Sequence, residues 1–532
     1  MKNRFVKHLL FYTVLTILII SCQTPGRDDK KKVTVDTSWL EEMTISELQL
    51  GYKEGRYLIA DLVSAYLDRI IELDKTGPGL NSIIMINPDA LQIAEELDKE
   101  MASGKIRGPL HGVPVILKDN IDTGDKMPTT AGSTALRDSY AKADSYIAKK
   151  LREAGAVIIA KANLSEWANF RAKTSSSGWS GVGGQTRNPY VLDRNPCGSS
   201  SGSGVAVSAN LCMVAIGTET DGSIVCPSNN NGIVGIKPTV GLLSRTGIIP
   251  IAFTQDTPGP MARTVEDAAA CLGTMTGVDS LDSKTIASAG KSLTDYTKFL
   301  VADGLKGKRI GHIRNSGGYN DRVDTLMVHA VKQMIAAGAV IIEIDAPRSR
   351  EFSDASYQVL LYEFKDGINK YFTGLGKDVP VKSLRDLIEF NRKDTIELKY
   401  FDQQILIEAE KKGDLTSPEY RTALAKILKA TREDGIDKLM NSNDLDAIIA
   451  PTGSPAWKTD LLLGDHFTGG SSSLAAISGY PAITVPMGFA GELPVGITFF
   501  GRAWSEPVLI GIAYSYEQAT RHRRAPRYLA TD

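Results

Sequence analysis

This 532-residue chain lacks an excess of charge of either sign, a metal-binding motif and a disulfide framework. Its 61 basic residues balance 62 acidic ones, so no overall electrostatic field favours nucleic acid or acidic lipid. The six histidines never occur in HExxH spacing, the five cysteines form no CxxC pair, and no GxxxxGKS or GxxxxGKT loop is present. These absences argue against a nucleic-acid-binding protein, a zinc enzyme and a P-loop nucleotide hydrolase.

The apolar content is enough for a large folded core. Hydrophobic residues make up 42% of the chain and charged residues 23%, and the mean hydropathy is -0.12. These values are typical of a globular protein and exclude a disordered or collagen-like chain.

The N-terminal segment has the anatomy of a signal peptide. Lys2, Arg4 and Lys7 precede an uncharged apolar stretch over residues 9–20. That stretch is too short for a transmembrane helix, which needs about 20 apolar residues. The tetrapeptide IISC at residues 19–22 resembles the lipobox of bacterial lipoproteins, in which the cysteine is acylated.

We therefore expect residues 1–21 to be a lipoprotein signal peptide, Cys22 to carry the lipid and residues 22–37 to form a flexible tether. The protein would be exported and lipid-anchored to a bacterial membrane in the cell envelope. Ordinary secretion with cleavage nearby is the alternative. The folded domain would span residues 38–527.

Two segments of the chain share one pattern of helix, glycine cap and buried strand. Tyr146–Glu153 leads into residues 154–159, and His329–Ala336 leads into residues 337–342. Their recurrence indicates two α/β units.

Apolar spacing elsewhere predicts further elements. A helix is expected within residues 45–73, a surface loop at 277–292, and apolar strands at 447–450, 482–485 and 495–500. The simplest architecture is α/β: a single large domain with a mixed central β-sheet flanked by helices.

Small polar residues gather in two segments near the middle of the chain, at residues 195–204 and 217–224. Clustered glycine and serine allow backbone N–H groups to approach a substrate closely. A flexible linker has a similar composition, but apolar residues 205–217 directly follow the first segment. The match of residues 198–202 to GxSxG is weak, because a nucleophile elbow must follow a buried strand and residues 190–197 are too polar.

Several motifs of the chain resemble those of the amidase signature family, and they fall in that family's order. They are GVPVILKDN at 112–120, GSS at 198–200, GTETDGSI at 217–224, GIVGIKPT at 232–239 and DTPGPMAR at 256–263. The resemblance covers about residues 38–526. Residues 163–170, 184–190, 197–202 and 223–227 are most similar to the peptide-amidase branch.

The resemblance implies a catalytic trio. Ser223 is similar to the family's acylated nucleophile, Ser199 to its cis-peptide serine and Lys118 to its base. Independently, a serine hydroxyl needs a base, and His111 is the only histidine near these motifs. A lysine can serve if burial lowers its pKa and keeps it neutral.

The backbone N–H groups of Thr220, Asp221, Gly222 and Ser223 resemble the family's oxyanion hole. Asp221 replaces the first glycine of the commoner GGS form. Val225 stands where many members have arginine, so substrate contacts known from those branches do not transfer.

Other polar residues near the motifs are expected to be structural. We interpret His111 as a buried structural histidine, and Asp119, Asp122 and Asp256 as members of ion pairs or turn caps. Cys197 and Cys226 flank the two serine-containing segments; they either pair as a disulfide or remain free thiols.

The predicted function is amide hydrolysis through an acyl-enzyme on Ser223, with no cofactor or metal and no nucleic-acid partner. The resemblance implies that the C-terminal amide of a peptide is the substrate. A broader acylamidase acting on fatty-acid or aryl amides is the enzymatic alternative, and a solute-binding lipoprotein is the non-enzymatic one. Trp167, Phe170 and Trp179 either line the acyl-group site or belong to the core.

Overall fold

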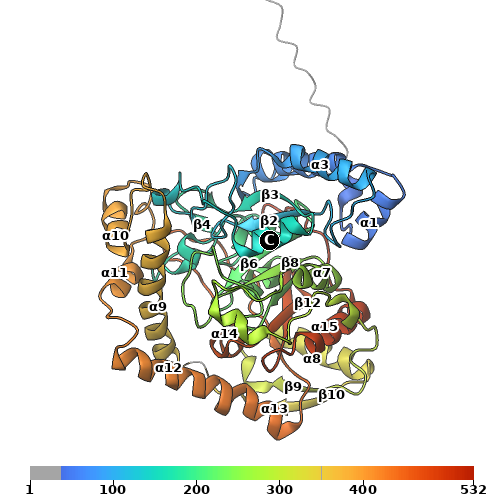
Figure 1. Cartoon of the computed structure of the whole chain (residues 1–532). Helices are drawn as coiled ribbons and strands as arrows, with labels where there is room; N and C mark the ends of the chain where they lie inside the picture. Colours follow the sequence, from blue (N-terminus) through green and yellow to red (C-terminus); the bar gives the residue numbers. More distant parts are fainter. Residues whose placement is uncertain (1–36, 349, 351, 532) are drawn as a thin grey trace, which may run out of the picture. The chain divides into compact units, whose positions relative to one another are not determined.

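The computed structural model describes residues 37–348, 350 and 352–531, and its centre is an 11-stranded mixed sheet (Figure 1). In spatial order the strands are β1 (Ile83–Ile86), β3 (Val157–Ala162), β2 (Pro114–Lys118), β6 (Val214–Glu219), β8 (Thr257–Ala262), β7 (Val234–Lys237), β12 (Ala482–Ala490), β13 (Leu493–Phe500), β11 (Ala447–Pro451), β9 (Arg309–Ile313) and β10 (Val340–Ile344). A separate two-stranded pair consists of β4 (Trp179–Ser180) and β5 (Gly184–Gln185).

Helices flank this sheet, which confirms the predicted α/β class. The helices are α1 (Ile45–Lys53), α2 (Ile59–Arg69), α3 (Ala90–Ala102), α4 (Tyr146–Glu153), α5 (Ser201–Ser208), α6 (Val225–Asn230), α7 (Val265–Met275), α8 (Asp321–Ala336), α9 (Ser353–Gly374), α10 (Leu384–Lys393), α11 (Gln404–Glu410), α12 (Pro418–Thr431), α13 (Asp437–Asn443), α14 (Ser473–Ser478) and α15 (Glu506–Thr520). Helices α4, α7, α15 and α8 contact one another in that order, and α5 contacts α6. Helices α9, α10 and α11 stand together beside the sheet, in orange tones in Figure 1.

The helix expected within residues 45–73 is interrupted. Helix α1 begins with a capping box in which Thr44 accepts the N–H of Glu47, and it ends at Lys53. Gly55 then adopts φ +66, a conformation that ends a helix, before α2 starts at Ile59. Apolar spacing continues across this break because both helices pack on the same core, so spacing alone did not reveal it.

The two predicted units of helix, glycine and strand are both present. Helix α4 leads through Gly155 to β3, and α8 leads through Gly338 to β10; the two glycines have φ +83 and +92. Strand β3 is buried along its whole length between β1 and β2. Strand β10 lies at the sheet edge with Val340 47% exposed, so the expectation of a buried strand there was wrong.

The C-terminal strands are longer than the apolar runs that predicted them. Strands β12 and β13 pair antiparallel, with a register shift between Pro486 and Gly488. The predicted loop at 277–292 contains only a 3-10 turn at Ser283–Ser288.

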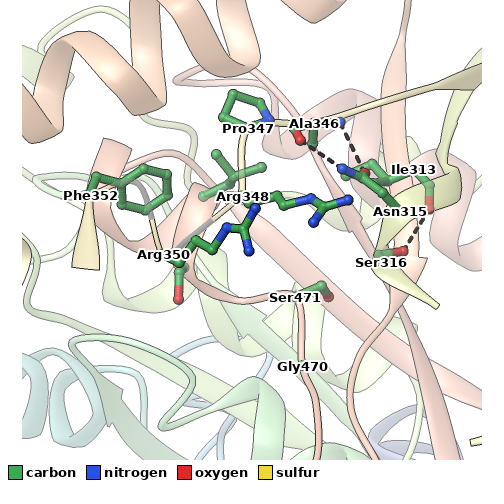
Figure 2. A pocket seen from close by; sticks show the side chains of 12 residues that line it. Ile313, Asn315, Ser316, Ala346, Pro347, Arg348, Arg350, Phe352, Gly470 and Ser471 are labelled. Atoms are coloured by element: carbon green, nitrogen blue, oxygen red, sulfur yellow. Dashed lines mark hydrogen bonds between the residues drawn. The ribbon is translucent and has the colours of Figure 1, made fainter. Parts of the chain in front are cut away.

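The carboxyl ends of parallel strands position the functional features of the chain. Strands β2 and β6 are parallel neighbours, as are β9 and β10. A cavity of about 330 Å³ opens beside the carboxyl ends of β9 and β10 (Figure 2). Ligand sites of open α/β sheets lie at such ends.

The two glycine caps offer a matched test of this packing. A Cβ at Gly155 would lie 2.8 Å from His111 Nδ1 and 2.9 Å from His111 Cα, whereas a Cβ at Gly338 would keep 3.4 Å from Lys306. Both alanine variants carry the cost of the left-handed backbone, about 1–2 kcal/mol. Gly155→Ala should lose about 1–3 kcal/mol more because of overpacking.

Urea unfolding of the two variants and the parent checks this expectation. Equal midpoints for Gly155→Ala and Gly338→Ala would contradict the close approach of Gly155 to His111.

Candidate active site

Two parallel strands place a lysine next to a loop rich in backbone N–H groups. Lys118 is the last residue of β2, and β6 ends at Glu219 immediately before residues 220–224. The register pairs Leu117 of β2 with Ile216 of β6. Because both strands run in one direction, Lys118 and the 220–224 loop emerge at the same edge of the sheet.

Lys118 is fully buried among hydroxyl and carbonyl oxygens. Its Nζ lies 2.7 Å from Ser199 Oγ, 2.9 Å from Thr218 Oγ1 and 3.2 Å from the Thr218 carbonyl oxygen. No carboxylate in the described part of the chain forms an ion pair with it. Burial lowers the pKa of Lys118 to about 7, although the negative charges of Asp256 and Glu219 act in the opposite direction. A large fraction of the amine is therefore neutral at neutral pH.

Ser199 lies between this lysine and the start of helix α5. The peptide bond between Gly198 and Ser199 is cis, and the Ser199 side chain is buried. The Ser199 carbonyl accepts the N–H of Ser165 at 3.0 Å. A Cβ at Gly198 would clash with Ser165 Oγ, so this position favours glycine.

Ser223 lies in the loop between β6 and α6. Gly222, which precedes it, has φ +83, and the Ser223 carbonyl accepts the N–H of Ser200 at 3.2 Å. That bond joins the two serine-containing segments. Among the described residues no hydrogen bond joins the Ser223 hydroxyl to Ser199 or Lys118. Such bonds are often long in a free enzyme and shorten when substrate is bound.

A buried carboxylate orders the backbone around Ser223. Glu219 accepts the N–H groups of Ile224 at 2.7 Å and Val225 at 3.0 Å. Burial raises the pKa of Glu219, while the charge of Lys237 and hydrogen bonds from backbone N–H groups, including that of Gly222, act in the opposite direction. Within the described chain no acceptor occupies the N–H groups of Thr220, Asp221 or Ser223.

Side chains from outside the loop fix its first residues. Thr220 donates its hydroxyl to Asp256 Oδ1 at 2.6 Å, and Ser472 donates its hydroxyl to Asp221 Oδ1 at 2.5 Å. Asp256 also accepts the N–H groups of Ile251 and Ala252 at 2.8 and 2.9 Å.

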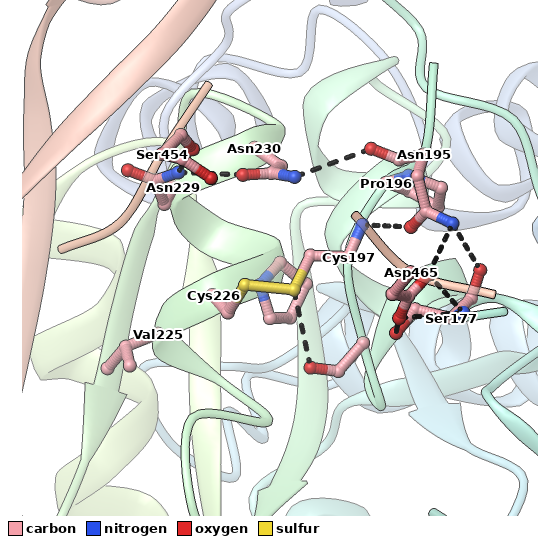
Figure 3. Close-up of a disulfide and its surroundings, with 12 residues drawn as sticks. Ser177, Asn195, Pro196, Cys197, Val225, Cys226, Asn229, Asn230, Ser454 and Asp465 are labelled. Atoms are coloured by element: carbon pink, nitrogen blue, oxygen red, sulfur yellow. Dashed lines mark hydrogen bonds between the residues drawn. A yellow bond between two sulfur atoms is a disulfide. The ribbon is translucent and has the colours of Figure 1, made fainter. Parts of the chain in front are cut away.

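A disulfide between Cys197 and Cys226 connects the two serine-containing segments (Figure 3). The sequence left open whether these cysteines pair, and the structure pairs them with 5.9 Å between their Cα atoms. Cys197 lies two residues before Ser199 and Cys226 three residues after Ser223. Trp457 packs with both cysteines in one apolar cluster. The disulfide therefore limits how far the two segments can separate.

The residues expected to be structural have structural contacts. His111 is buried, its Nε2 lies 3.3 Å from the Leu97 carbonyl and its Nδ1 accepts the N–H of Arg107. Asp122 accepts the Tyr371 hydroxyl at 2.9 Å. Asp119 accepts the Thr130 hydroxyl and lies 3.9 Å from Lys161. Asp256 caps a turn, as described above.

The three aromatic residues considered for the acyl-group site are core residues. Trp167, Phe170 and Trp179 are each less than 9% exposed. Their rings contact those of Phe372, Phe364 and Phe401 respectively, at centroid distances of 6.1, 5.0 and 5.2 Å.

Sequence reasoning missed Thr218 and Glu219. Thr218 gives Lys118 two of its three polar contacts, and Glu219 orders the loop around Ser223. Both residues lie inside the GTETDGSI motif, and this position in the motif was the sequence feature that could have identified them. Among the described residues no group of three or more histidine, cysteine, aspartate or glutamate side chains is placed to hold a metal ion.

Comparisons with known proteins agree with this architecture. A family profile described as Amidase matches residues 61–510. A probable amidase of Arabidopsis thaliana is 41% identical, with 98% of this chain and 99% of that protein covered. The crystal structure of a peptide amidase from Stenotrophomonas maltophilia is similar with a TM-score of 0.88 and 48% identity, covering 92% of this chain and 99% of that one. A putative amidase of Schizosaccharomyces pombe is 37% identical, covering 92% of this chain and 87% of that protein.

The expectation of an exported protein that is lipid-anchored to a bacterial membrane is wrong. The relatives that align with most of the chain are named as amidases or glutamyl-tRNA(Gln) amidotransferase components and come from plant, fungal and bacterial sources. Residues 1–21 and Cys22, on which the expectation depended, lie outside the described residues. In the described part of the chain no helix is both long and apolar enough to cross a membrane.

The disulfide generates a stability prediction. The double variant Cys197→Ser/Cys226→Ser should lose about 3–4 kcal/mol of unfolding free energy, because the open chain gains conformational freedom when this loop is no longer closed. Urea unfolding with and without a thiol reductant measures the effect. The reductant should lower the midpoint of the parent protein and leave that of the double variant unchanged.

Cys271→Ala is the matched control, because Cys271 is a buried free thiol. Reductant should lower the urea midpoint of Cys271→Ala as it does that of the parent protein. A parent protein with no response to reductant would contradict a constraining disulfide.

Proposed function

The chain belongs to the amidase family, and from this premise we propose that it is a serine amidohydrolase whose residues Lys118, Ser199 and Ser223 carry out the reaction. Its reaction is hydrolysis of a C–N amide bond. The burial of Lys118 against Ser199, with no ion-pair partner in the described chain, is the observation that supports the proposed trio most strongly. We assign the amidase domain to residues 38–527.

Neutral Lys118 acts as the base. A neutral amine has two N–H groups and one lone pair, and the Thr218 hydroxyl and carbonyl provide acceptors for both N–H groups. The lone pair then faces Ser199 Oγ at 2.7 Å. Ser199 gives its proton to Lys118 and takes the proton of Ser223, whose oxygen attacks the amide carbon.

The remaining steps return the proton. The tetrahedral intermediate collapses as the proton passes from Lys118 through Ser199 to the leaving nitrogen, so that ammonia departs and Ser223 holds the acyl group. A water molecule then attacks the acyl-enzyme with the same base, which releases the carboxylic acid.

The oxyanion formed during attack is stabilised by the backbone N–H groups of Thr220, Asp221 and Ser223. Gly222, the fourth donor that the sequence predicted, directs its N–H to Glu219 instead. Loss of one such donor typically costs about 2.7–4 kcal/mol of transition-state stabilisation. The bonds from Thr220 to Asp256 and from Ser472 to Asp221 support this role, because they hold the loop before substrate arrives.

We propose the C-terminal carboxamide of a peptide as the substrate. Support comes from the likeness to a structure named peptide amidase, at 48% identity over 92% of this chain. A broader acylamidase acting on fatty-acid or aryl amides is the alternative.

The assignment of the base makes a pH prediction. Because the active form of Lys118 is neutral and its pKa is lowered to about 7, kcat/KM should be low in acid, rise as the pH passes through about 7 and level off above it. Lys118→Arg should be inactive at every pH, since guanidinium stays protonated. Initial rates of ammonia release between pH 5 and about 10 measure the profile.

Ser223→Ala tests the nucleophile in the same assay and should remove turnover. Ser228→Ala is the matched control, because Ser228 is a buried serine of α6 whose hydroxyl has no partner among the described residues. Near-full activity of Ser223→Ala, or a profile of the parent protein with no rise near pH 7, would contradict the proposed roles.

The substrate assignment predicts ammonia release from N-blocked dipeptide amides. Free glutamine and asparagine should release little, and longer peptides should stay intact by mass spectrometry, because a leaving-group site shaped for ammonia excludes a continuing chain. Preference for long-chain acyl amides over peptide amides would favour the acylamidase alternative.

A further inference from the structure

A cavity separate from the Lys118 contacts lies beside the carboxyl ends of β9 and β10 (Figure 2). Its volume is about 330 Å³, in the range of small-ligand sites. Asn315 follows β9 and Ala346 follows β10, and they hold each other through two hydrogen bonds of 2.9 and 3.1 Å. This wall of the cavity is thus fixed without a ligand.

Two arginines give the described lining of the cavity a positive charge. Arg348 and Arg350 line it, and both guanidinium groups extend into it in Figure 2. None of the described residues that line it is aspartate or glutamate. In the described chain neither arginine has an ion-pair partner, whereas the nearby Arg314, which does not line the cavity, pairs with Asp345 at 2.5 Å.

Part of the cavity lining is apolar. Ile313, Phe352 and Leu474 line it and belong to one buried cluster. Val225, two residues after Ser223, is a member of the same cluster. A ligand here would meet two cations and an apolar surface.

The cavity adjoins the loop that carries Ser223. Ser471 and Ser473 line the cavity, and Ser472 between them donates to Asp221 Oδ1 at 2.5 Å. A Cβ at Gly222 would lie 3.1 Å from Ser472 Oγ. One short segment of chain therefore separates the cavity from the proposed oxyanion site.

We propose that this cavity binds the carboxylate of an acidic side chain in the acyl part of the substrate. This inference rests on the proposed function and names a substrate class within it: peptide amides with glutamate or aspartate within two residues of the carboxamide. An extended residue spans about 3.3–3.6 Å, so two residues extend about 7 Å from the carbon that Ser223 attacks before the acidic side chain adds its own length. Arginine pairs carboxylates through two parallel hydrogen bonds.

The test compares isosteric substrates that differ in charge. N-acetyl-Glu-Leu-amide is measured against N-acetyl-Gln-Leu-amide, and N-acetyl-Leu-Glu-amide against N-acetyl-Leu-Gln-amide. In at least one pair the acid should have a kcat/KM about five- to tenfold higher, as expected for a partly exposed charge pair. The ratio should fall as salt is raised.

Variants connect the preference to the two arginines. The double variant Arg348→Gln/Arg350→Gln should reduce the ratio to about 1, whereas Arg314→Gln, a matched arginine outside the cavity, should keep it. A ratio near 1 in the parent protein, or a ratio that survives the double variant, would overturn the proposal.

A binding measurement separates this proposal from the proposed function. Ser223→Ala protein is titrated with each acid and its isosteric amide by calorimetry, which needs no turnover. Tighter binding of the acid that is lost in Arg348→Gln/Arg350→Gln supports the cavity assignment even if no peptide amide is hydrolysed. Equal affinities overturn it. Competition by inorganic phosphate as strong as that by the peptide acid would show a free-anion site instead and also overturn it.

Discussion

Removal of one amine from water is the constraint on which the active site depends. Lys118 has no exposed surface, and burial lowers its pKa to about 7 against the opposing charges of Asp256 and Glu219. Lys161, on the neighbouring strand, is equally buried, and burial lowers its pKa too, although the charge of Asp119 at 3.9 Å acts in the opposite direction. The two buried amines differ in their neighbours: Lys161 has a carboxylate within ion-pair distance, whereas the closest partners of Lys118 are the hydroxyls of Ser199 and Thr218.

The rest of the site holds groups around that amine. Parallel strands β2 and β6 bring Lys118 to the loop that carries Ser223, and the disulfide between Cys197 and Cys226 connects that loop to the segment of Ser199. Glu219 orders the backbone that follows the nucleophile. Beside these groups, the cavity of Arg348 and Arg350 provides positive charge that the proposed chemistry does not use, and so it is better suited to substrate selection.

Local patterns in the sequence predicted much of this arrangement. The motifs placed Lys118 and Ser199 in the same site, and helix–glycine–strand spacing predicted α4 with β3. Contacts set by tertiary packing were not predictable: the exposure of β10 depends on its place at the sheet edge, and the Thr218 contact depends on register between β2 and β6. The sequence gives no sign that Arg348 and Arg350 line a cavity, because the fold is needed to bring them beside two strand ends and residues 470–473.

The protonation state of Lys118 tests the account most directly. Side-chain NMR of protein labelled with ¹³C and ¹⁵N in lysine, with the Lys118 resonance assigned by its loss in Lys118→Arg, reports that state across a pH titration. The account predicts that the Lys118 resonance shifts with a midpoint near pH 7, well below the unperturbed value of about 10.4. A Lys118 resonance that keeps its charged position up to about pH 10 would contradict a neutral lysine base.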